Sequence, residues 1–278
     1  MKFVTYAAGA GPRVGLLEQG RVLDVGFNGD MVGFIEAGAP VAVRTPIKDA
    51  ILLAPLRPRS LRDFLAFEGH LRNVMPRLGR EIPDQWYTVP AYYKGLPDTV
   101  IGPNSDISWP AYTDRLDHEL EFAAIIGRKG KDVPVGEALD YVFGYTIWND
   151  MSARDTQTDE LPIGMGPAKA KDWDGSNVLG PCIVTAAEID PQNLHMSVRV
   201  NGETWGSDTS AHMHHSIAEM IRYASQAQTI YPGEVFGSGT ASGGSGVELD
   251  RWLKEGDLVE MEVEGIGILS NRIGRKGV

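Results

Sequence analysis

Alternation between apolar and polar residues recurs along this chain and favours β-strands over helices. The run DLVEMEVEGIGILSNRI at 257–273 alternates strongly, which places every second side chain on one face of a sheet. LHMSVRV (194–200) leads into Asn201-Gly202, a dipeptide typical of a tight hairpin turn. HSIAEMIRYASQ (215–226) has the apolar spacing of an amphipathic helix. The chain is therefore expected to adopt an all-β or β-rich α+β fold, with a rolled or barrel-like sheet and long loops.

Two domains are expected from the distribution of turns and prolines. Residues 1–57 read as short strands punctuated by glycine, which is typical of a small N-terminal β-rich domain. APLRPRSLRDF (54–64), with its two prolines and three arginines, is the expected link into a second domain. That domain would cover residues 58–278 and carry the chemistry. A chain of 278 residues is long enough for such a division.

Charge and composition exclude several classes of partner. A formal net charge of −11 at pH 7 argues against nucleic acid and against anionic membranes. The single cysteine, Cys182, allows no intramolecular disulfide and favours a reducing compartment. No apolar run approaches the ~18 residues of a membrane span, and the first residues lack the pattern of a signal peptide. We expect a cytoplasmic protein that acts on a small molecule.

The stretch HELEFAAIIG (118–127) reads as a buried strand that carries two acids one residue apart. Because successive strand residues face opposite ways, Glu119 and Glu121 share one face, where their carboxylates would repel each other. A divalent cation between them would remove the repulsion. On spacing alone, a solvated face of an antiparallel sheet remains the alternative.

Two further acids extend this pair. Asp150 ends the next expected strand, FGYTIWND (143–150), and Asp63 lies seven residues before His70. Hard cations such as Mg²⁺, Mn²⁺ or Ca²⁺ prefer oxygen ligands, whereas zinc is disfavoured because no thiolate or close pair of histidines accompanies the acids. The candidate metal ligands are Glu119, Glu121, Asp150 and Asp63.

Four blocks of sequence together resemble the fumarylacetoacetate hydrolase family. In chain order they are DHELEFAAIIG, GYTIWNDMSARDTQ, GPAKAKDWDGSNVLGPCIVT and GSGTASG. Their order and rough spacing match the family over about residues 60–275, and NDMSARD is the most specific piece. The resemblance implies a mixed β-roll with a small N-terminal β domain, usually as a homodimer. It also implies a divalent metal, Mg²⁺ or else Mn²⁺ or Ca²⁺, in the mouth of the sheet.

The resemblance assigns roles to individual residues as well. It implies that the metal ligands are Glu119, Glu121 and Asp150, with Asp63 as a fourth acid. It implies that the catalytic residues are His70, Glu248, Lys171, Arg154 and Gln157, and that Tyr93 and Thr240 contact substrate. Two positions depart from the pattern. Short members carry a His-x-x-Glu pair on a lid, where this chain has Asn73, and the enzyme that names the family has a tyrosine where this chain has Leu161.

The expected activity is metal-dependent hydrolysis of a carbon–carbon bond in a 1,3-diketo or acylpyruvate-type (2,4-dioxo acid) substrate. The metal would stabilise the departing enolate, and His70 with Glu248 would activate water, because a histidine side chain exchanges protons near neutral pH. Lys171, Gln157 and Arg154 would donate to the tetrahedral oxyanion. Two alternatives stay open: decarboxylation of oxaloacetate or isomerisation of a hydroxymuconate-type acid on the same scaffold, and a non-catalytic binding protein with a structural metal.

Overall fold

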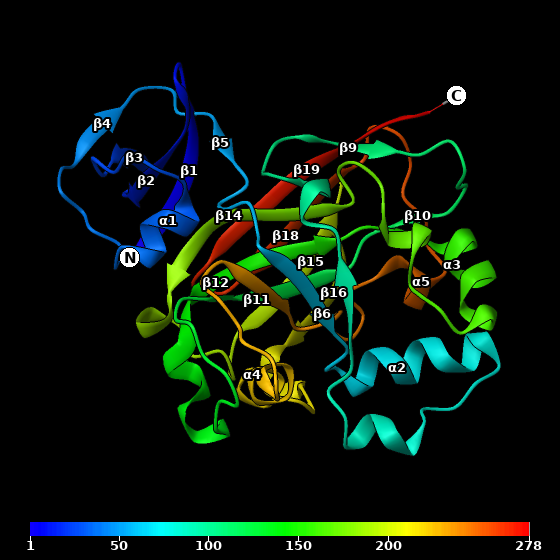
Figure 1. Ribbon diagram of the computed structural model, residues 1–278. Helices are drawn as coiled ribbons and strands as arrows, with labels where there is room; N and C mark the ends of the chain where they lie inside the picture. The colour runs from blue at the N-terminus through cyan, green and yellow to red at the C-terminus, as the bar shows by residue number, and fades with distance from the viewer. Residues whose placement is uncertain (278) are drawn as a thin grey trace.

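The computed structural model describes residues 1–277 and arranges them as β-sheets with short helices at their edges (Figure 1). The strands are β1 (Lys2–Ala8), β2 (Gly11–Glu18), β3 (Arg21–Asp24), β4 (Thr45–Ile47), β5 (Leu52–Leu53), β6 (Ser60–Phe64), β7 (Tyr92–Gly95), β8 (Val100–Ile101), β9 (Asp106–Trp109), β10 (Leu116–Asp117), β11 (Leu120–Ile126), β12 (Val142–Asp150), β13 (Ser152–Ala153), β14 (Asn177–Thr185), β15 (His195–Val200), β16 (Glu203–Thr209), β17 (Glu234–Gly237), β18 (Leu258–Val263) and β19 (Gly267–Lys276). The α-helices are α1 (Met31–Glu36), α2 (Glu68–Val74), α3 (Arg154–Glu160), α4 (Ile217–Ser225) and α5 (Gly246–Leu249). Short 3-10 helices cover Met75–Leu78, Asp84–Tyr87, Pro97–Thr99, Val135–Tyr141, Leu161–Ile163, Lys169–Lys171, Ala186–Glu188 and Ser210–His212.

The largest sheet is mixed and holds twelve strands. Its main path runs β4-β3-β2-β1-β14-β12-β11-β17-β6-β7, with β5 beside β1 and β8 beside β14. β17 pairs with β6 in parallel, whereas β11 is antiparallel to both β12 and β17. The expected β-rich α+β architecture is confirmed. A closed barrel is excluded for residues 1–277, because the path ends at β4 and β7 without returning on itself.

The second large sheet has the order β16-β15-β18-β19-β9. Asn201 and Gly202 connect β15 to β16 with φ of 51° and 80°. Positive φ at both central residues is what a tight hairpin turn of this kind requires, so the predicted hairpin is confirmed. The predicted amphipathic helix is α4, whose first turn is closed by a capping box between Ser216 and Glu219.

The N-terminal residues extend the largest sheet instead of forming an isolated one. β1 pairs with β2 on one side and with β14 on the other. The sequence did not predict α1, which Asp30 caps by accepting a hydrogen bond from the Gly33 amide at 2.8 Å. Phe34 of α1 packs edge-on against Phe3 of β1 and covers that part of the sheet. The domain boundary after residue 57 stays a prediction.

Burial in the middle of the largest sheet sets the environment of the site. Every residue of β11 is buried, and β12 on its flank is buried almost throughout. Charged side chains on these strands therefore lie away from water and need compensating partners. Within residues 1–277, no helix has the length and apolar character needed to cross a membrane.

Candidate metal centre and active site

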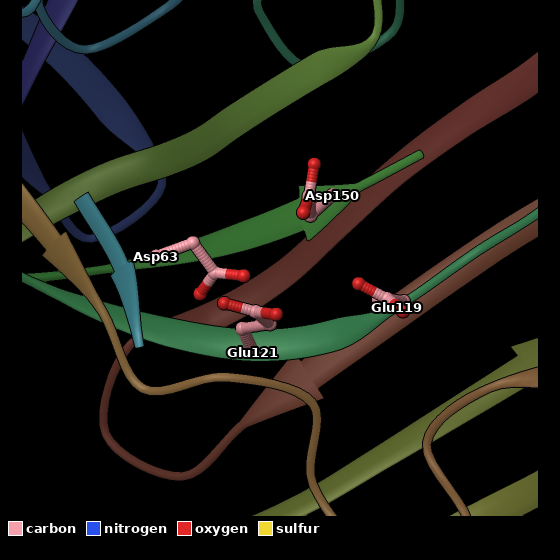
Figure 2. A group of neighbouring side chains, drawn as sticks. All are labelled: Asp63, Glu119, Glu121 and Asp150. Atoms are coloured by element: carbon pink, nitrogen blue, oxygen red, sulfur yellow. The ribbon is translucent and has the colours of Figure 1, made fainter. Parts of the chain in front are cut away.

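Three strands of the largest sheet bring four carboxylates to one place (Figure 2). Asp63 comes from β6, Glu121 from β11 and Asp150 from the end of β12, while Glu119 lies just before β11. One carboxylate oxygen from each residue lies within 4.8 Å of those of the others, and all four residues are buried. The solvated-sheet alternative is thereby excluded, because these acids face a shared interior space.

A glycine on the intervening strand allows Asp63 and Glu121 to meet. β17 lies between β6 and β11, and its Gly237 is opposite Asp63 in the register. A Cβ at Gly237 would lie 2.8 Å from Glu121 Oε2 and 2.6 Å from the ring of Trp148. Only a residue without a side chain leaves room for the Glu121 carboxylate to reach across β17.

Glu119 lies just outside the regular strand β11 and is held by contacts with Ser245 and Asn149. The expected strand over 118–127 begins at Leu120 in the structure, and Glu119 forms a single bridge with Ser245. The Asn149 side-chain oxygen accepts the Glu119 amide at 3.1 Å, so a side chain replaces a ladder hydrogen bond there. Glu119 and Glu121 nevertheless lie on the same face, as expected, and belong to the same cluster.

Two buried cations compensate part of the acidic charge. Lys171 Nζ donates to Glu119 and, at 2.7 Å, to Asp150 Oδ2. Burial opposes the charge of Lys171, but Asp150 and Glu119 outweigh it and raise the pKa of the ammonium group. Arg154 donates to Glu119 Oε1 at 2.7 Å. Burial favours the neutral form of Glu119, yet Lys171 and Arg154 prevail and lower its pKa, so this acid is ionised.

The other side of the cluster lacks such compensation. Among residues 1–277, Asp63 Oδ1, Glu121 Oε1 and Asp150 Oδ1 are buried and have no hydrogen-bond partner. Burial, followed by repulsion from neighbouring acids, raises the pKa of both Asp63 and Glu121 well above the usual range. Buried oxygens with unused lone pairs and excess negative charge fit a hard divalent cation. The cluster is thus able to bind a divalent metal.

A histidine–glutamate pair lies beside the acids. His70 on α2 and Glu248 on α5 are both buried, and His70 Nδ1 is 2.8 Å from Glu248 Oε1. A carboxylate only accepts, so Nδ1 carries the proton and donates it, which leaves Nε2 free to accept. Burial would raise the pKa of Glu248, but hydrogen bonds from His70 and Asn73 lower it, so the carboxylate is ionised.

Asn73 occupies the position three residues after His70 where short members of the family carry a glutamate, and it contacts Glu248 instead. Its Nδ2 donates to Glu248 Oε2 at 2.7 Å, from one turn after His70. The Gly243 amide donates to the same oxygen at 2.7 Å, and Ser245 Oγ donates to Oε1 at 2.9 Å. The carboxylate partner of His70 thus comes from α5, and Asn73 helps to hold it in place.

One pocket of about 350 Å³ collects most of the predicted site residues. Its lining includes Asp63, His70, Tyr93, Glu119, Arg154, Gln157, Lys171 and Thr240. Glu121 and Asp150 belong to the adjoining acidic cluster, and Glu248 lies behind His70. Tyr93 was expected to contact substrate, and its hydroxyl donates to Asp150 Oδ2 at 2.6 Å in the structure. The functional roles of these residues stay predictions.

Sequence reasoning missed Asp117, which connects the two halves of the site. Its Oδ2 accepts from Arg154 Nε at 2.8 Å, and its Oδ1 accepts the Gly246 amide at the start of α5 at 2.7 Å. Asp117 thereby ties the arginine that contacts Glu119 to the helix that carries Glu248. The signal was present in the sequence, since Asp117 continues the period-two series of Glu119 and Glu121.

We expect Asp117→Asn to lower kcat about 10–100-fold and to destabilise the protein by about 1–3 kcal/mol. The new amide group cannot accept hydrogen bonds at both positions, so a buried donor of Arg154 or of α5 loses its partner. Thermal unfolding and steady-state kinetics measure the two effects. Asp106→Asn, at an exposed position of β9, is the control and should change neither. Wild-type kcat in Asp117→Asn would contradict the connecting role.

The comparisons with known proteins agree with this geometry. The sequence model described as fumarylacetoacetate (FAA) hydrolase C-terminal matches residues 60–274. The chain belongs to the fumarylacetoacetate hydrolase family. It is therefore an enzyme of this superfamily. The acidic cluster and the pocket both lie within the matched residues.

The relatives and solved structures that resemble this chain carry different names, and three of the four described here are named for different reactions. An uncharacterized protein of Pyrococcus abyssi is 34% identical over 83% of this chain and 96% of its own length. An oxaloacetate tautomerase of Bacillus subtilis is 34% identical over 82% of this chain and 74% of its own. Among solved structures, a fumarylacetoacetate hydrolase from Exiguobacterium antarcticum superposes with a TM-score of 0.84 at 28% identity, over 99% of both chains. A 5-carboxymethyl-2-hydroxymuconate delta-isomerase from Mycobacterium smegmatis superposes with a TM-score of 0.81 at 28% identity, over 100% of both chains.

Proposed function

We propose that this enzyme is a divalent-metal-dependent hydrolase that cleaves a carbon–carbon bond of a 2,4-dioxo acid. The observation that supports this most directly is the buried His70–Glu248 pair, because His70 lines the same pocket as Asp63 and Glu119. Hydrolysis needs a base for an attacking water molecule, and this pair supplies one. Enol–keto conversion needs no attacking water.

In the proposed reaction, His70 acts as the base and Glu248 stabilises its positive charge. His70 Nε2 takes a proton from water, and the hydroxide oxygen bonds to C4 of the substrate, whose carbonyl becomes a tetrahedral oxyanion. The C3–C4 bond then breaks, which releases a carboxylic acid and the enolate of pyruvate. A proton returned to C3 completes pyruvate. Glu248 stays ionised and stabilises the charge that His70 carries in between, as a buried carboxylate partner does for a catalytic histidine.

The groups expected to stabilise the oxyanion, Lys171 and Gln157, line the same pocket as His70. Lys171 keeps its charge while it donates to Glu119 and Asp150, so it would attract the oxyanion electrostatically. Gln157 accepts from Arg154 NH1 at 2.9 Å through its side-chain oxygen, which leaves its NH₂ group as a donor. Preorganised donors of this kind lower the barrier by roughly 2.7–4 kcal/mol each. Asp63, Glu119, Glu121 and Asp150 would hold the metal, Mg²⁺ with Mn²⁺ or Ca²⁺ as alternatives, which supplies Lewis-acid stabilisation of enolate charge. Assembly as a homodimer and a cytoplasmic location stay predictions.

The second candidate is a tautomerase or isomerase. It is favoured by the oxaloacetate tautomerase of Bacillus subtilis and by the delta-isomerase of Mycobacterium smegmatis, which share sequence and fold with this chain. Both candidate reactions pass through enol chemistry at an acidic metal site. They differ in whether water enters the product.

Product analysis separates the two candidates. The purified enzyme is incubated with Mg²⁺ or Mn²⁺ and either acetylpyruvate or enol-oxaloacetate, and loss of the enol absorbance is followed. We expect acetylpyruvate to give equal amounts of acetate and pyruvate, with incorporation of one oxygen atom from H₂¹⁸O into acetate. Loss of enol absorbance from oxaloacetate with no cleavage of acetylpyruvate would instead establish the tautomerase candidate. An EDTA-treated sample is the control for the metal requirement.

A further inference from the structure

The pocket has an apolar wall that the proposed chemistry does not use. This wall comes from the segments after His70 and after Gln157, and not from the strands that carry the acids. Its residues are Val74, Met75, Leu78, Leu161 and Pro167. An apolar surface that lines a catalytic pocket is a means of recognising the part of a substrate that does not react.

The position of this wall follows from helix geometry. His70, Val74 and Leu78 are spaced four residues apart, and all three line the pocket. His70 and Val74, four residues apart on α2, share one face of that helix, and Met75 and Leu78, three apart in the following 3-10 turn, share a face there, so both segments border the pocket. Val74 lies about 6 Å along the axis from His70, and Leu78 lies roughly 8 Å beyond it. The pocket therefore runs from the proposed base toward an apolar end.

The cations of the pocket are already engaged at its acidic end. Arg154 donates to Asp117, Glu119 and Gln157, and Lys171 donates to Glu119 and Asp150. Among residues 1–277 no other lysine or arginine lines the pocket.

Two arginines of the segment after His70, Arg72 and Arg77, are engaged as well, and Arg80 is exposed and does not line the pocket. Arg72 pairs with Glu68 on the same helix, at 2.6 Å. Arg77 NH2 donates to the Glu248 carbonyl at 2.7 Å. None of these arginines lines the pocket, so a second carboxylate on the substrate would find no pocket-lining cation at the apolar end and would gain nothing from the hydrocarbon side chains there.

We propose that the substrate carries an uncharged apolar group beyond C4, and that Val74, Leu78 and Leu161 select it. This inference rests on the proposed function for the position of C4, and it makes the preferred substrate a 2,4-dioxo acid with an alkyl or aryl tail. Acids with a second carboxylate at the far end are excluded as good substrates. Each buried methylene of the tail contributes about a fourfold gain in affinity.

A pair of unreactive ligands of equal length tests the tail preference without turnover. N-butyl oxamate and N-(3-carboxypropyl) oxamate share a 2-oxo acid-like head and differ in a terminal methyl against a terminal carboxylate. With the Mn²⁺-loaded enzyme, titration calorimetry should give at least tenfold tighter binding of N-butyl oxamate. N-ethyl oxamate, two methylenes shorter, should bind about 15-fold more weakly than N-butyl oxamate. Equal or tighter binding of the carboxylate-tailed ligand would overturn the proposal.

A charge introduced at the apolar end gives a second, independent readout. Leu78→Arg supplies the missing cation at a side chain that is 37% exposed, and Leu139→Arg is the matched control at 38% exposure outside the pocket. Leu78→Arg should shift the affinity ratio of the two ligands at least tenfold toward the carboxylate, whereas Leu139→Arg should leave it unchanged. An unchanged ratio in Leu78→Arg would show that the tail lies elsewhere. If the enzyme does not hydrolyse 2,4-dioxo acids, product analysis would show no cleaved product, whereas the two ligands would still differ in affinity.

Discussion

Glu121→Gln is expected to abolish metal-dependent turnover while the metal-free protein stays folded and at least as stable as the unsubstituted chain. Glu121 is fully buried, and one of its oxygens has no hydrogen-bond partner within residues 1–277. Burial and repulsion from Asp63 raise the pKa of Glu121, so its charged form is disfavoured in the metal-free protein, and glutamine keeps the shape without that charge. Replacing a buried charge by a neutral group of equal volume is often neutral or stabilising.

The metal-loaded protein should respond in the opposite direction. A ligand that binds only the folded state stabilises it by about 2.7 kcal/mol at a concentration of 100 Kd. Loss of a direct ligand should weaken Mn²⁺ binding by more than about 100-fold, because even indirect partners of metal ligands contribute 10–100-fold. Glu121→Gln should therefore show little or no rise in Tm when Mn²⁺ is added to EDTA-treated protein, whereas the unsubstituted chain should show a clear rise.

A surface glutamate supplies the control. Glu262 on β18 pairs with Arg199 at 2.9 Å, and its side chain is 46% exposed. Glu262→Gln should keep both turnover and the Mn²⁺-dependent rise in Tm. Full stabilisation of Glu121→Gln by Mn²⁺ would show that the cluster does not hold the metal.

The acidic cluster could be predicted in part because strand periodicity is a local property. Alternation alone places Glu119 and Glu121 on one face, and the same rule extends to Asp117, which was overlooked. The approach of Asp63 could not be derived in this way, since it depends on the parallel pairing of β6 with β17 and on the absence of a side chain at Gly237. Such a requirement appears only once the strand order is known.

Contacts between residues far apart in the sequence could not be predicted either. Asn73 and Glu248 are 175 residues apart, and no local pattern says that the amide of one would hold the carboxylate of the other. The helix α1 was missed for a different reason. Its six residues include a glycine and form no periodic pattern of helical length, so the Asp30 cap and the packing of Phe34 stabilise it where local propensity does not.

His70→Ala should separate hydrolysis from enol chemistry more clearly than any other single change. Removal of a positioned base lowers a rate by about 10²–10⁴ when that base is required, so kcat/KM for cleavage of acetylpyruvate should fall by this factor. Mn²⁺ binding should be unaffected, because His70 is not one of the four clustered acids. His212→Ala is the control, since His212 is exposed and pairs with Asp208 outside the pocket.

A double substitution tests whether His70 and Glu248 act as one unit. Glu248→Gln alone should slow cleavage, because the glutamine is neutral and stabilises a protonated imidazole less than the carboxylate does. Added to His70→Ala, it should slow cleavage little further, since groups that work together lose most of their effect when one is removed. Rates for enol-oxaloacetate measured on the same variants show whether enol–keto conversion depends on the same two residues. If acetylpyruvate cleavage survives in His70→Ala, the base lies elsewhere, and if only enol–keto conversion is ever observed, the acidic cluster serves a tautomerase.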